Sequence, residues 1–268
     1  MELAVLGSGS RGNAFAVRAR GVSMLLDAGF GPQTLTKRAE RVGIDLGALV
    51  GVVLTHEHGD HARGAGRIAR AAGCPVYASA GTLAALADRL GDVPRHRIEP
   101  LRPLSIGPFS LTGCHTSHDA AEPMAFVVST TGGKLGLAYD LGRPTTAVRY
   151  LLRDVTTLLL EANHDEIMLR TGNYPPAVRE RIAGAGGHLS NRAAAELVAE
   201  LIHEGLELVV LVHLSDRCNR SDLARSEVER ALAGRRFRGK VLVALQDEPL
   251  PPIRVAREPS QFELALTG

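Results

Sequence analysis

The chain has 268 residues, of which 45% are hydrophobic and 22% are charged, and its formal net charge is +2. This length can bury a large core as one two-layered domain or as two fused halves. No apolar run approaches the ~20 residues that span a bilayer, and the N-terminus lacks the pattern of a signal peptide. We therefore expect no membrane segment and a cytoplasmic location. The small net charge neither requires nor excludes a nucleic-acid partner.

The cysteines are few and irregularly spaced. They are Cys74, Cys114 and Cys218, an odd number without the spacing of a zinc finger, which argues against a disulfide framework. We expect all three to be reduced and packed in the interior. A ligand role for Cys114 is an alternative, because His115 and His118 lie close to it in the sequence.

The first part of the chain alternates short apolar runs with turns. We expect strands at 2–6, 14–18, 22–27 and 49–54 and a helix at 32–42. Between the first two strands, Gly7 to Asn13 forms a Gly/Ser loop whose backbone N–H groups could hold an oxyanion. The loop lacks the lysine of a P-loop and opens no helix, so a hairpin connection is the preferred interpretation.

The segment after the strand at 49–54 has the strongest chemical signature. It contains His56, His58, Asp60 and His61 within six residues, directly before a stretch typical of a helix. Alternate residues after a strand end can reach one point together, so His56 and His58 are expected to share a site. Asp60 and His61, one turn further on, are expected to face a second site nearby. Imidazole and carboxylate groups suit zinc and other first-row divalent ions, and two clusters on one loop favour a two-metal site.

The remainder of the chain continues as a layered α/β pattern without repeats or linkers. Expected helices are 62–72, 82–90, 175–183, 192–204 and 222–233, and expected strands are 76–78, 97–101, 109–112, 126–130, 135–139, 156–160, 208–212 and, at an edge, 241–245. Ser190 and Ser221 are expected to be the N-caps of the last two helices. The tail from Pro249 has no predicted function.

Three further candidate ligands lie after predicted strands. His118 supplies a third histidine for the first site, and its neighbour His115 is interpreted as a surface residue. Asp140 could cap a following helix, but we favour a carboxylate that bridges two ions about 3.5–4 Å apart. His213 completes the second site.

Other polar residues also follow strands or precede helices. Glu161 ends a predicted strand and could orient a metal-bound histidine. His164 is interpreted as local structure or as a residue at the edge of the substrate. His188 precedes a helix start, where backbone N–H groups favour an anion. It could steady a phosphoryl oxygen or protonate a leaving group.

The pattern HxHxDH at His56–His61 resembles the signature of the metallo-β-lactamase-fold hydrolase superfamily. Diiron oxidoreductases of the same fold differ in having a carboxylate where His58 stands, so the pattern favours hydrolysis over electron transfer. The resemblance implies an α/β (α+β) fold, the αββα sandwich, in which two mixed β-sheets are flanked by helices and the metals lie at one sheet edge. It also implies a single domain at 1–268 with two pseudo-symmetric halves, roughly 1–120 and 121–268.

Further motifs are similar to those of the WalJ (YycJ)-type branch, bacterial proteins of this fold associated with 5′→3′ exonuclease activity on DNA. They are GSGSRGN, THEHGDH, SHDAAEP, LEANHDEIML, GHLSN and HLS. Glu161 and His188 match a glutamate and a histidine of tRNA 3′-end processing endonucleases, which supports a phosphodiester substrate. No β-CASP insertion is evident between Asp140 and His188. The chain departs from the branch at Tyr139, where threonine is common, and at residues 216–219. Either departure could alter substrate binding.

We interpret the chain as a two-metal phosphodiesterase with DNA as the expected substrate. The two ions would be Zn²⁺ or Mn²⁺, and the resemblance implies that they are held by His56, His58 and His118 and by Asp60, His61 and His213, with Asp140 bridging. Asp60 would also hold the attacking hydroxide, and His188 would assist the departing oxygen. Candidates for supporting the ligands or contacting substrate are Glu161, Asn191, Ser10 and Asn13.

Two alternatives stay open. The first is a hydrolase of small phosphodiesters, thioesters or lactones, which could use the same metal core. Activity on long DNA that falls steeply with added salt would distinguish a nuclease from such a hydrolase. The second alternative is a non-catalytic metal-binding regulatory module. The complete ligand set together with His188 argues against it.

Overall fold

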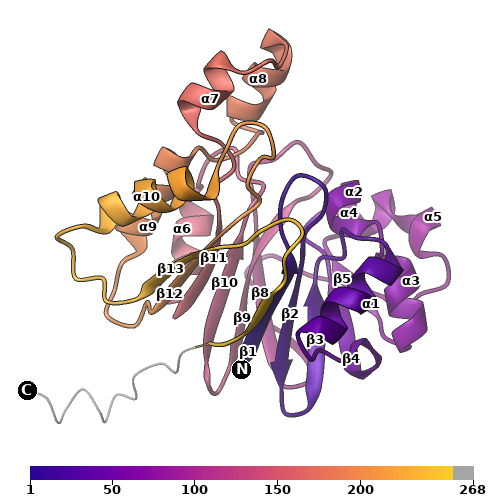
Figure 1. The fold of residues 1–268 in the computed structure, drawn as a ribbon. Helices are drawn as coiled ribbons and strands as arrows, with labels where there is room; N and C mark the ends of the chain where they lie inside the picture. Colours follow the sequence, from indigo (N-terminus) through magenta and orange to yellow (C-terminus); the bar gives the residue numbers. More distant parts are fainter. Residues whose placement is uncertain (256–268) are drawn as a thin grey trace, which may run out of the picture.

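In the computed structural model, which describes residues 1–255, two seven-stranded β-sheets pack face to face and helices cover both outer faces (Figure 1). The first sheet comes mostly from the N-terminal part of the chain and the second from the C-terminal part. This layering confirms the predicted αββα sandwich.

The first sheet has the strand order β14-β1-β2-β3-β4-β5-β6. Its strands are β1 (Glu2–Gly7), β2 (Ala14–Ala19), β3 (Val22–Leu26), β4 (Leu49–Val53), β5 (Val76–Ala78), β6 (Arg95–Arg97) and β14 (Leu250–Arg254). The helices on its side of the molecule are α1 (Pro32–Arg41), the short 3₁₀ helix η1 (Leu46–Ala48), α2 (Gly59–Ala62), α3 (Ala65–Ala72), α4 (Ala80–Ala85) and α5 (Ala87–Leu90).

The second sheet has the strand order β13-β12-β11-β10-β9-β8-β7. Its strands are β7 (Leu104–Ile106), β8 (Phe109–His115), β9 (Met124–Thr130), β10 (Gly133–Ala138), β11 (Thr157–Glu161), β12 (Leu208–Val212) and β13 (Lys240–Val243). It is covered by α6 (Thr146–Leu152), α9 (Asn191–Leu201) and α10 (Ser221–Leu232). Two more helices, α7 (Glu166–Thr171) and α8 (Pro176–Ala183), project beyond the sandwich (Figure 1), and we call residues 166–183 the arm.

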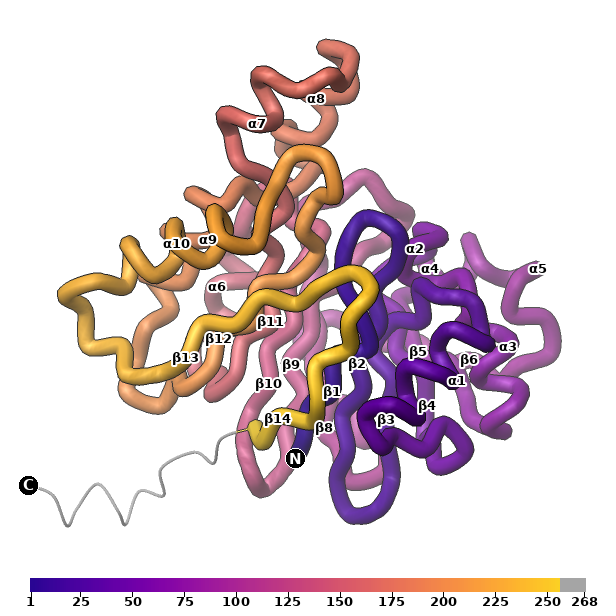
Figure 2. Tube along the Cα trace, in the orientation of Figure 1, coloured from indigo at the N-terminus to yellow at the C-terminus, as the bar shows by residue number. Residues whose placement is uncertain are grey.

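Both sheets are mixed, and their parallel parts bring several strand ends together. Strands β3 to β6 run parallel to one another, as do β10 to β13. The carboxyl ends of parallel strands in a sheet lie at one edge, and here the two sheets present these ends at the same edge of the sandwich. Figure 2 shows the loop between β1 and β2 at this edge, and the Ser8 hydroxyl there accepts a hydrogen bond of 2.8 Å from the His213 backbone N–H.

Apolar side chains on both faces of the inner strands hold the layers together. In β12, Val210 and Val212 belong to the core between the sheets, whereas Val209 and Leu211 pack with the side chains of α9 and α10. The sequence of such a strand is a continuous apolar run, because both faces of the strand are buried. A third apolar cluster fills the space between the first sheet and its helices.

Most predicted elements are present, and the differences have local causes. The strand predicted at 97–101 is wrong: the strand is β6, and Leu101 has a left-handed φ of 59°, which a strand does not permit. The helix predicted at 82–90 is divided into α4 and α5 at Leu86. Ser190 caps α9 as predicted, but the N-cap of α10 is Arg220 and not Ser221.

The elements η1, β7, β14, α6 and α7 have no counterpart among the predictions. Strand β14 contains Pro251 and Pro252, which disfavour a strand inside a sheet. It lies at an edge of the first sheet, where proline is tolerated. The rest of the C-terminal tail, residues 256–268, lies outside the described residues.

The cysteines and His115 behave as predicted. All three cysteines are free and buried, and His115 is exposed. Burial raises the pKa of the Cys114 thiol to about 12, and Cys114 belongs to none of the possible metal-binding groups within the described residues. Across residues 1–255, no helix combines the length and hydropathy that a bilayer crossing requires.

Gly29 packs very closely against the segment that carries the predicted ligands. A Cβ atom at Gly29 would lie 1.7 Å from the backbone oxygen of Asp60 and 2.7 Å from the backbone nitrogen of Asn13. The neighbouring Ala28 N–H donates to the His61 carbonyl over 2.6 Å. Glycine at this position therefore lets the loop after β3 support the ligand-bearing turn directly.

We expect Gly29→Ala to lower the free energy of unfolding by about 1–3 kcal/mol, because the neighbouring backbone must move to admit the methyl group. Denaturant unfolding of the metal-free protein measures the change. Gly31→Ala is the control, because a Cβ atom there meets nothing within 4 Å, and it should cost less than about 1 kcal/mol. Equal stabilities of the two variants would contradict this account of Gly29.

Candidate metal centre

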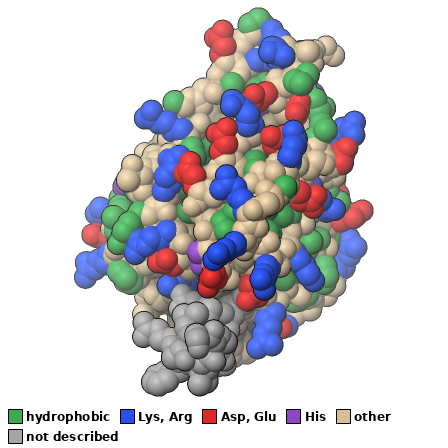
Figure 3. Space-filling model, turned by 90° about the vertical axis from the view of Figure 1, so that its left-hand side faces the viewer, with side chains coloured by type: hydrophobic (Ala, Val, Ile, Leu, Met, Phe, Trp, Pro, Cys, Tyr) green, Lys and Arg blue, Asp and Glu red, His purple; other side chains and the backbone are tan. Residues whose placement is uncertain are grey.

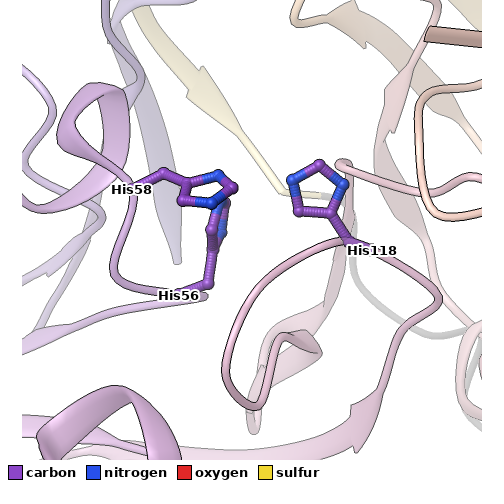
Figure 4. Close-up of side chains that lie close together, drawn as sticks. All are labelled: His56, His58 and His118. Carbon is purple, nitrogen blue, oxygen red and sulfur yellow. The ribbon is translucent and has the colours of Figure 1, made fainter. Parts of the chain in front are cut away.

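The turn after β4 presents the first predicted ligands. It leads through His56 and His58 into α2, a single helical turn that carries Asp60 and His61. Figure 4 shows the imidazoles of His56 and His58 facing that of His118, which comes from the loop after β8. Residues that are far apart in the sequence thus converge on one point.

Two hydrogen bonds tie the loop that carries His118 to the turn after β4. Glu57 Oε1 accepts a hydrogen bond of 2.7 Å from the Ala121 N–H, and the Thr55 carbonyl accepts one of 3.0 Å from the Met124 N–H. Glu57 occupies the variable position of the motif, and in this chain it helps to hold the opposing loop in place.

Six of the predicted ligands form two groups of three. The first group is His56, His58 and His118, and the second is Asp60, His61 and His213. Within each group the potential ligand atoms lie within 4.8 Å of one another, so a single ion could contact all three. The structure therefore brings together each of the two sets inferred from the sequence.

Asp140 lies between the two groups. Its Oδ2 atom is 4.0 Å from His56 Nε2 and 3.0 Å from His61 Nε2. Its Oδ1 atom is 3.8 Å from His118 Nε2 and 3.2 Å from His213 Nε2. Each oxygen thus faces one histidine of each group, so the carboxylate lies within reach of both. The helix-cap alternative does not hold, because α6 begins well after Asp140 and has its own N-cap residue.

Two imidazoles are oriented through the nitrogen that faces away from Asp140. His118 Nδ1 lies 3.1 Å from the Gly187 carbonyl oxygen, to which it can only donate. His56 Nδ1 lies 3.0 Å from the Thr55 hydroxyl. When Nδ1 carries the proton, Nε2 holds the lone pair that a metal ion requires, so these contacts select the ligating form of each ring.

Asp27, at the end of β3, is a support that the sequence analysis missed. Its buried carboxylate accepts hydrogen bonds from the Thr55 N–H (2.8 Å) and hydroxyl (2.7 Å), from His61 Nδ1 (2.7 Å) and from the Tyr139 hydroxyl. Tyr139 follows β10, so this one carboxylate joins the two sheets directly beside the ligands. The signal that could have identified it is an aspartate at a strand end followed by Gly29.

His213 is held by the hairpin loop between β1 and β2. Asn13 Nδ2 lies 2.9 Å from His213 Nδ1 and 3.4 Å from His61 Nε2. The Ser8 hydroxyl donates to Asn13 Oδ1 over 2.7 Å. Asn13 is fully buried, so its side chain positions the histidine and does not meet the solvent.

His188 lies beside Asp140 and is held by Glu161. His188 Nδ1 is 2.7 Å from Glu161 Oε1 and 3.2 Å from Asp140 Oδ1. Glu161 Oε2 accepts from the backbone N–H groups of Leu141 and Leu189 over 2.9 and 3.0 Å. Glu161 thus orients His188, whereas the prediction is that it orients a metal-bound histidine. His188 also belongs to a further group that could hold an ion, with Asp140, Glu161 and His213.

Burial and neighbouring charges shift the pKa values of these groups. Burial alone would lower the pKa of His61, but the charges of Asp140 and Asp60 raise it well above its usual value. Burial would likewise lower the pKa of His188, but the charges and hydrogen bonds of Glu161 and Asp140 raise it to about 10. The carboxylates therefore create a field that favours positive charge, and divalent cations could take the place of these protons.

Two buried atoms of the site have no hydrogen-bond partner within the described residues. They are His56 Nε2 and Asp140 Oδ2, the second of which lies 3.0 Å from His61 Nε2 without the geometry of a hydrogen bond. Leaving a buried polar atom unpaired costs about 1–3 kcal/mol. Both atoms belong to groups that could bind an ion, and imidazole nitrogen and carboxylate oxygen are ligands of first-row divalent metals. The residues present therefore fit divalent-metal binding.

The candidate centre lines a cleft of about 230 Å³. Ser10, Tyr174 and Arg181 also line this cleft, and Ser10 and Arg181 are exposed. Asn191, by contrast, is buried and pairs with Asn219 through amide hydrogen bonds of 2.8 and 2.9 Å. Among the described residues it is therefore Ser10, and not Asn191, that is placed to meet a substrate.

Comparison with known proteins identifies the family and the fold. A family model described as a β-lactamase superfamily domain matches residues 23–214. The exodeoxyribonuclease YycJ of Bacillus anthracis is 30% identical over 261 residues, which cover 95% of this chain and 98% of that protein. The exodeoxyribonuclease WalJ of Streptococcus pneumoniae is 30% identical over 237 residues, or 87% of this chain and 88% of that protein. The metallo-β-lactamase fold protein YhfI from Bacillus subtilis shares the fold, with a TM-score of 0.70 at 19% identity over 93% of this chain and 98% of that chain.

We expect Asp27→Asn to weaken divalent-metal binding by about 10–100-fold, because an amide cannot accept all the hydrogen bonds that orient His61 and Thr55. Competition with a chromogenic chelator measures the affinity. Asp92→Asn, at a side chain that is 88% exposed, is the control and should bind metal as the parent does. If the two variants have the same affinity, Asp27 does not position the ligands.

Proposed function

The chain belongs to the family of β-lactamase superfamily domains and is a metal-dependent hydrolase, and we propose that it is a two-metal phosphodiesterase that digests DNA from a strand end. The observation that carries the proposal is the position of Asp140 between two groups of three candidate ligands, at a cleft. The relatives named exodeoxyribonucleases match nearly the whole chain and support DNA as the substrate.

The proposed ligand sets follow the two groups. Asp140 would be shared by the two ions. The other ligands would be His56, His58 and His118 for one ion and Asp60, His61 and His213 for the other. We propose Zn²⁺ or Mn²⁺, since both accept nitrogen and oxygen ligands. When bound, such a pair of ions lowers the pKa of a water molecule and stabilises negative charge on a phosphoryl group.

The chain's own side chains would complete the reaction. The Asp60 carboxylate lies 3.1 Å from His61 Nε2 and is 26% exposed, so it can accept a hydrogen bond from the attacking water. His188 is held through Nδ1 by Glu161, which leaves Nε2 to donate a proton to the departing oxygen. Glu161 in turn keeps the His188 ring in that orientation.

Digestion of 5′-labelled and 3′-labelled duplex DNA tests the proposed function. We expect stepwise shortening from the 5′ end that is abolished by chelation, restored by manganese or zinc, and weakened steeply by added salt because phosphate contacts release counterions. Hydrolysis of a chromogenic phosphodiester without digestion of DNA would instead support a small-substrate hydrolase. No turnover of either substrate by metal-loaded protein would favour the regulatory module.

The role of His188 can be separated from that of the ligands. We expect His188→Ala to retain two ions per chain while turnover falls by about 10²–10⁴-fold, the usual contribution of a general acid. Asp140→Ala and His213→Ala should instead lose metal, because each removes a ligand. Metal analysis of reconstituted protein, combined with turnover, distinguishes these cases. If His188→Ala loses an ion and His213→Ala keeps both, His188 is the ligand and the assignment is wrong.

A further inference from the structure

A second cavity lies next to the metal cleft. It has a volume of about 610 Å³ and is lined by the arm, by the start of α9 and by the loop after β11. Figure 1 shows that the arm projects from the sandwich above the ends of β10 and β11. His188 lines both this cavity and the metal cleft, so the two spaces share a wall. We call this second space the arm cavity.

His164 lines the arm cavity and has an unpaired polar atom. The residue is only 3% exposed, and its Nδ1 atom has no hydrogen-bond partner among residues 1–255. Its backbone is fixed, because the His164 carbonyl accepts a hydrogen bond of 2.8 Å from the Asn191 N–H. A buried polar atom without a partner costs about 1–3 kcal/mol. The His164 residue thus lies in the wall of the arm cavity with one ring nitrogen unpaired.

Arginines outnumber carboxylates around the arm cavity. It is lined by Arg170, Arg179 and Arg192, against Glu166 and Glu180. Glu166 is already engaged, since it accepts hydrogen bonds from Arg192 Nε over 3.0 Å and from the serine that caps α9 over 2.9 Å. Arg179 donates to the Arg170 carbonyl, and neither Arg170 nor Arg179 has a carboxylate partner in the described part of the chain. These two guanidinium groups are available to an anion.

Charges of both signs alternate on the face of the molecule that Figure 3 presents, where Lys and Arg side chains are interspersed with Asp and Glu. The formal net charge of the chain is only +2. Positive charge is concentrated locally, in the arm cavity and in a cavity beside β13 that is lined by Arg236, Arg238, Lys240 and Arg254. Of these two, the arm cavity is the one that adjoins the metal cleft.

The remaining wall of the arm cavity is partly apolar. Leu169, Pro176 and Leu189 contribute to it. The volume lies within the range of small-molecule sites, which is about 300–1,000 Å³. A ligand with a phosphate at one end and a flat, weakly polar ring at the other would match both parts of the wall. A nucleotide has this chemistry.

We propose that the arm cavity binds the 5′-terminal nucleotide of the DNA strand, with its 5′-phosphate at Arg170 and Arg179 and beside His164. This inference rests on the proposed function and specifies how the strand end is recognised. The first phosphodiester of the strand then lies in the adjoining metal cleft. His188, which borders both spaces, faces the oxygen that joins the terminal nucleotide to the rest of the strand.

Hydrolysis of this first phosphodiester forms one bond to phosphorus and breaks another. Water forms a new bond to phosphorus and loses a proton to bulk solvent, and the bond from phosphorus to the 3′ oxygen of the terminal nucleotide breaks. His188 donates its proton to that oxygen. The products are a deoxynucleoside 5′-monophosphate in the arm cavity and a strand that is one nucleotide shorter and carries a new 5′-phosphate.

Binding of a mononucleotide to chelator-treated protein tests the site without any turnover. We expect dAMP to bind in a calorimetric titration and deoxyadenosine to bind at least about tenfold more weakly, because it lacks the phosphate. The double variant Arg170→Gln, Arg179→Gln should weaken dAMP binding by a similar factor. Arg67→Gln, at an exposed position on α3, is the matched control. The proposal is overturned if dAMP does not bind, or if the double variant and the control bind it equally.

Digestion assays separate a failure of this inference from a failure of the proposed function. The parent protein should digest a 5′-phosphorylated strand faster than a 5′-hydroxyl strand, and the double variant should lose this preference while Arg67→Gln keeps it. If DNA is not digested but dAMP binding depends on Arg170 and Arg179, the proposed function fails and the nucleotide site stands. If DNA is digested without preference for a 5′-phosphate and the double variant digests it at the parent rate, the site fails and the function stands.

Discussion

The buried carboxylate of Asp27 is the interaction on which the candidate centre depends. Its hydrogen-bond donors are Thr55 after β4, His61 on α2 and Tyr139 after β10. Because these residues come from three elements and from both sheets, one side chain fixes the two sheets relative to each other at the edge where the ligands lie. Breaking a buried charged pair by removing one partner typically costs about 3–5 kcal/mol. The candidate ligands are therefore held in place by a shared hydrogen-bond network around Asp27 and do not lie on independent loops.

The backbone near the centre is held in a conformation that it would not adopt freely. Asp27, Asp140 and His213 have left-handed φ angles of 54°, 53° and 56°, and each lies within two residues of a strand end. For residues other than glycine this conformation costs of the order of 1–3 kcal/mol. Surrounding hydrogen bonds maintain it, such as those from the Asp27 N–H to the Val53 carbonyl and from the His213 N–H to Ser8, both 2.8 Å. Strain at three convergent positions is typical of a functional site.

The candidate ligands were predictable from the sequence because each stands in a short motif at the end of an apolar run. Their supports were not, because no local pattern reports a contact between distant residues. Asp27 and Tyr139 are 112 positions apart, and Asn13 and His213 are 200 positions apart. The same limit applies to the arm cavity, whose wall is assembled from the arm, the loop after β11 and α9. His164 is predicted to belong to local structure or to the edge of the substrate, and its backbone does make local contacts with Ser190 and Asn191. Its unpaired nitrogen and its place in the wall of the arm cavity, which no sequence pattern reports, favour the substrate edge.

Glu161 links the two spaces that we assign to the substrate. One of its oxygens holds His188, and the other accepts from the Leu141 N–H after Asp140 and from the Leu189 N–H at the arm cavity. The carboxylate therefore fixes the proposed bridging residue, the proposed proton donor and a wall of the nucleotide site in one network. Donors that are positioned before the substrate arrives need no reorganisation during the reaction, which is the main source of electrostatic stabilisation in enzymes. A single buried glutamate thus sets the geometry between the proposed strand-end site and the proposed site of bond cleavage.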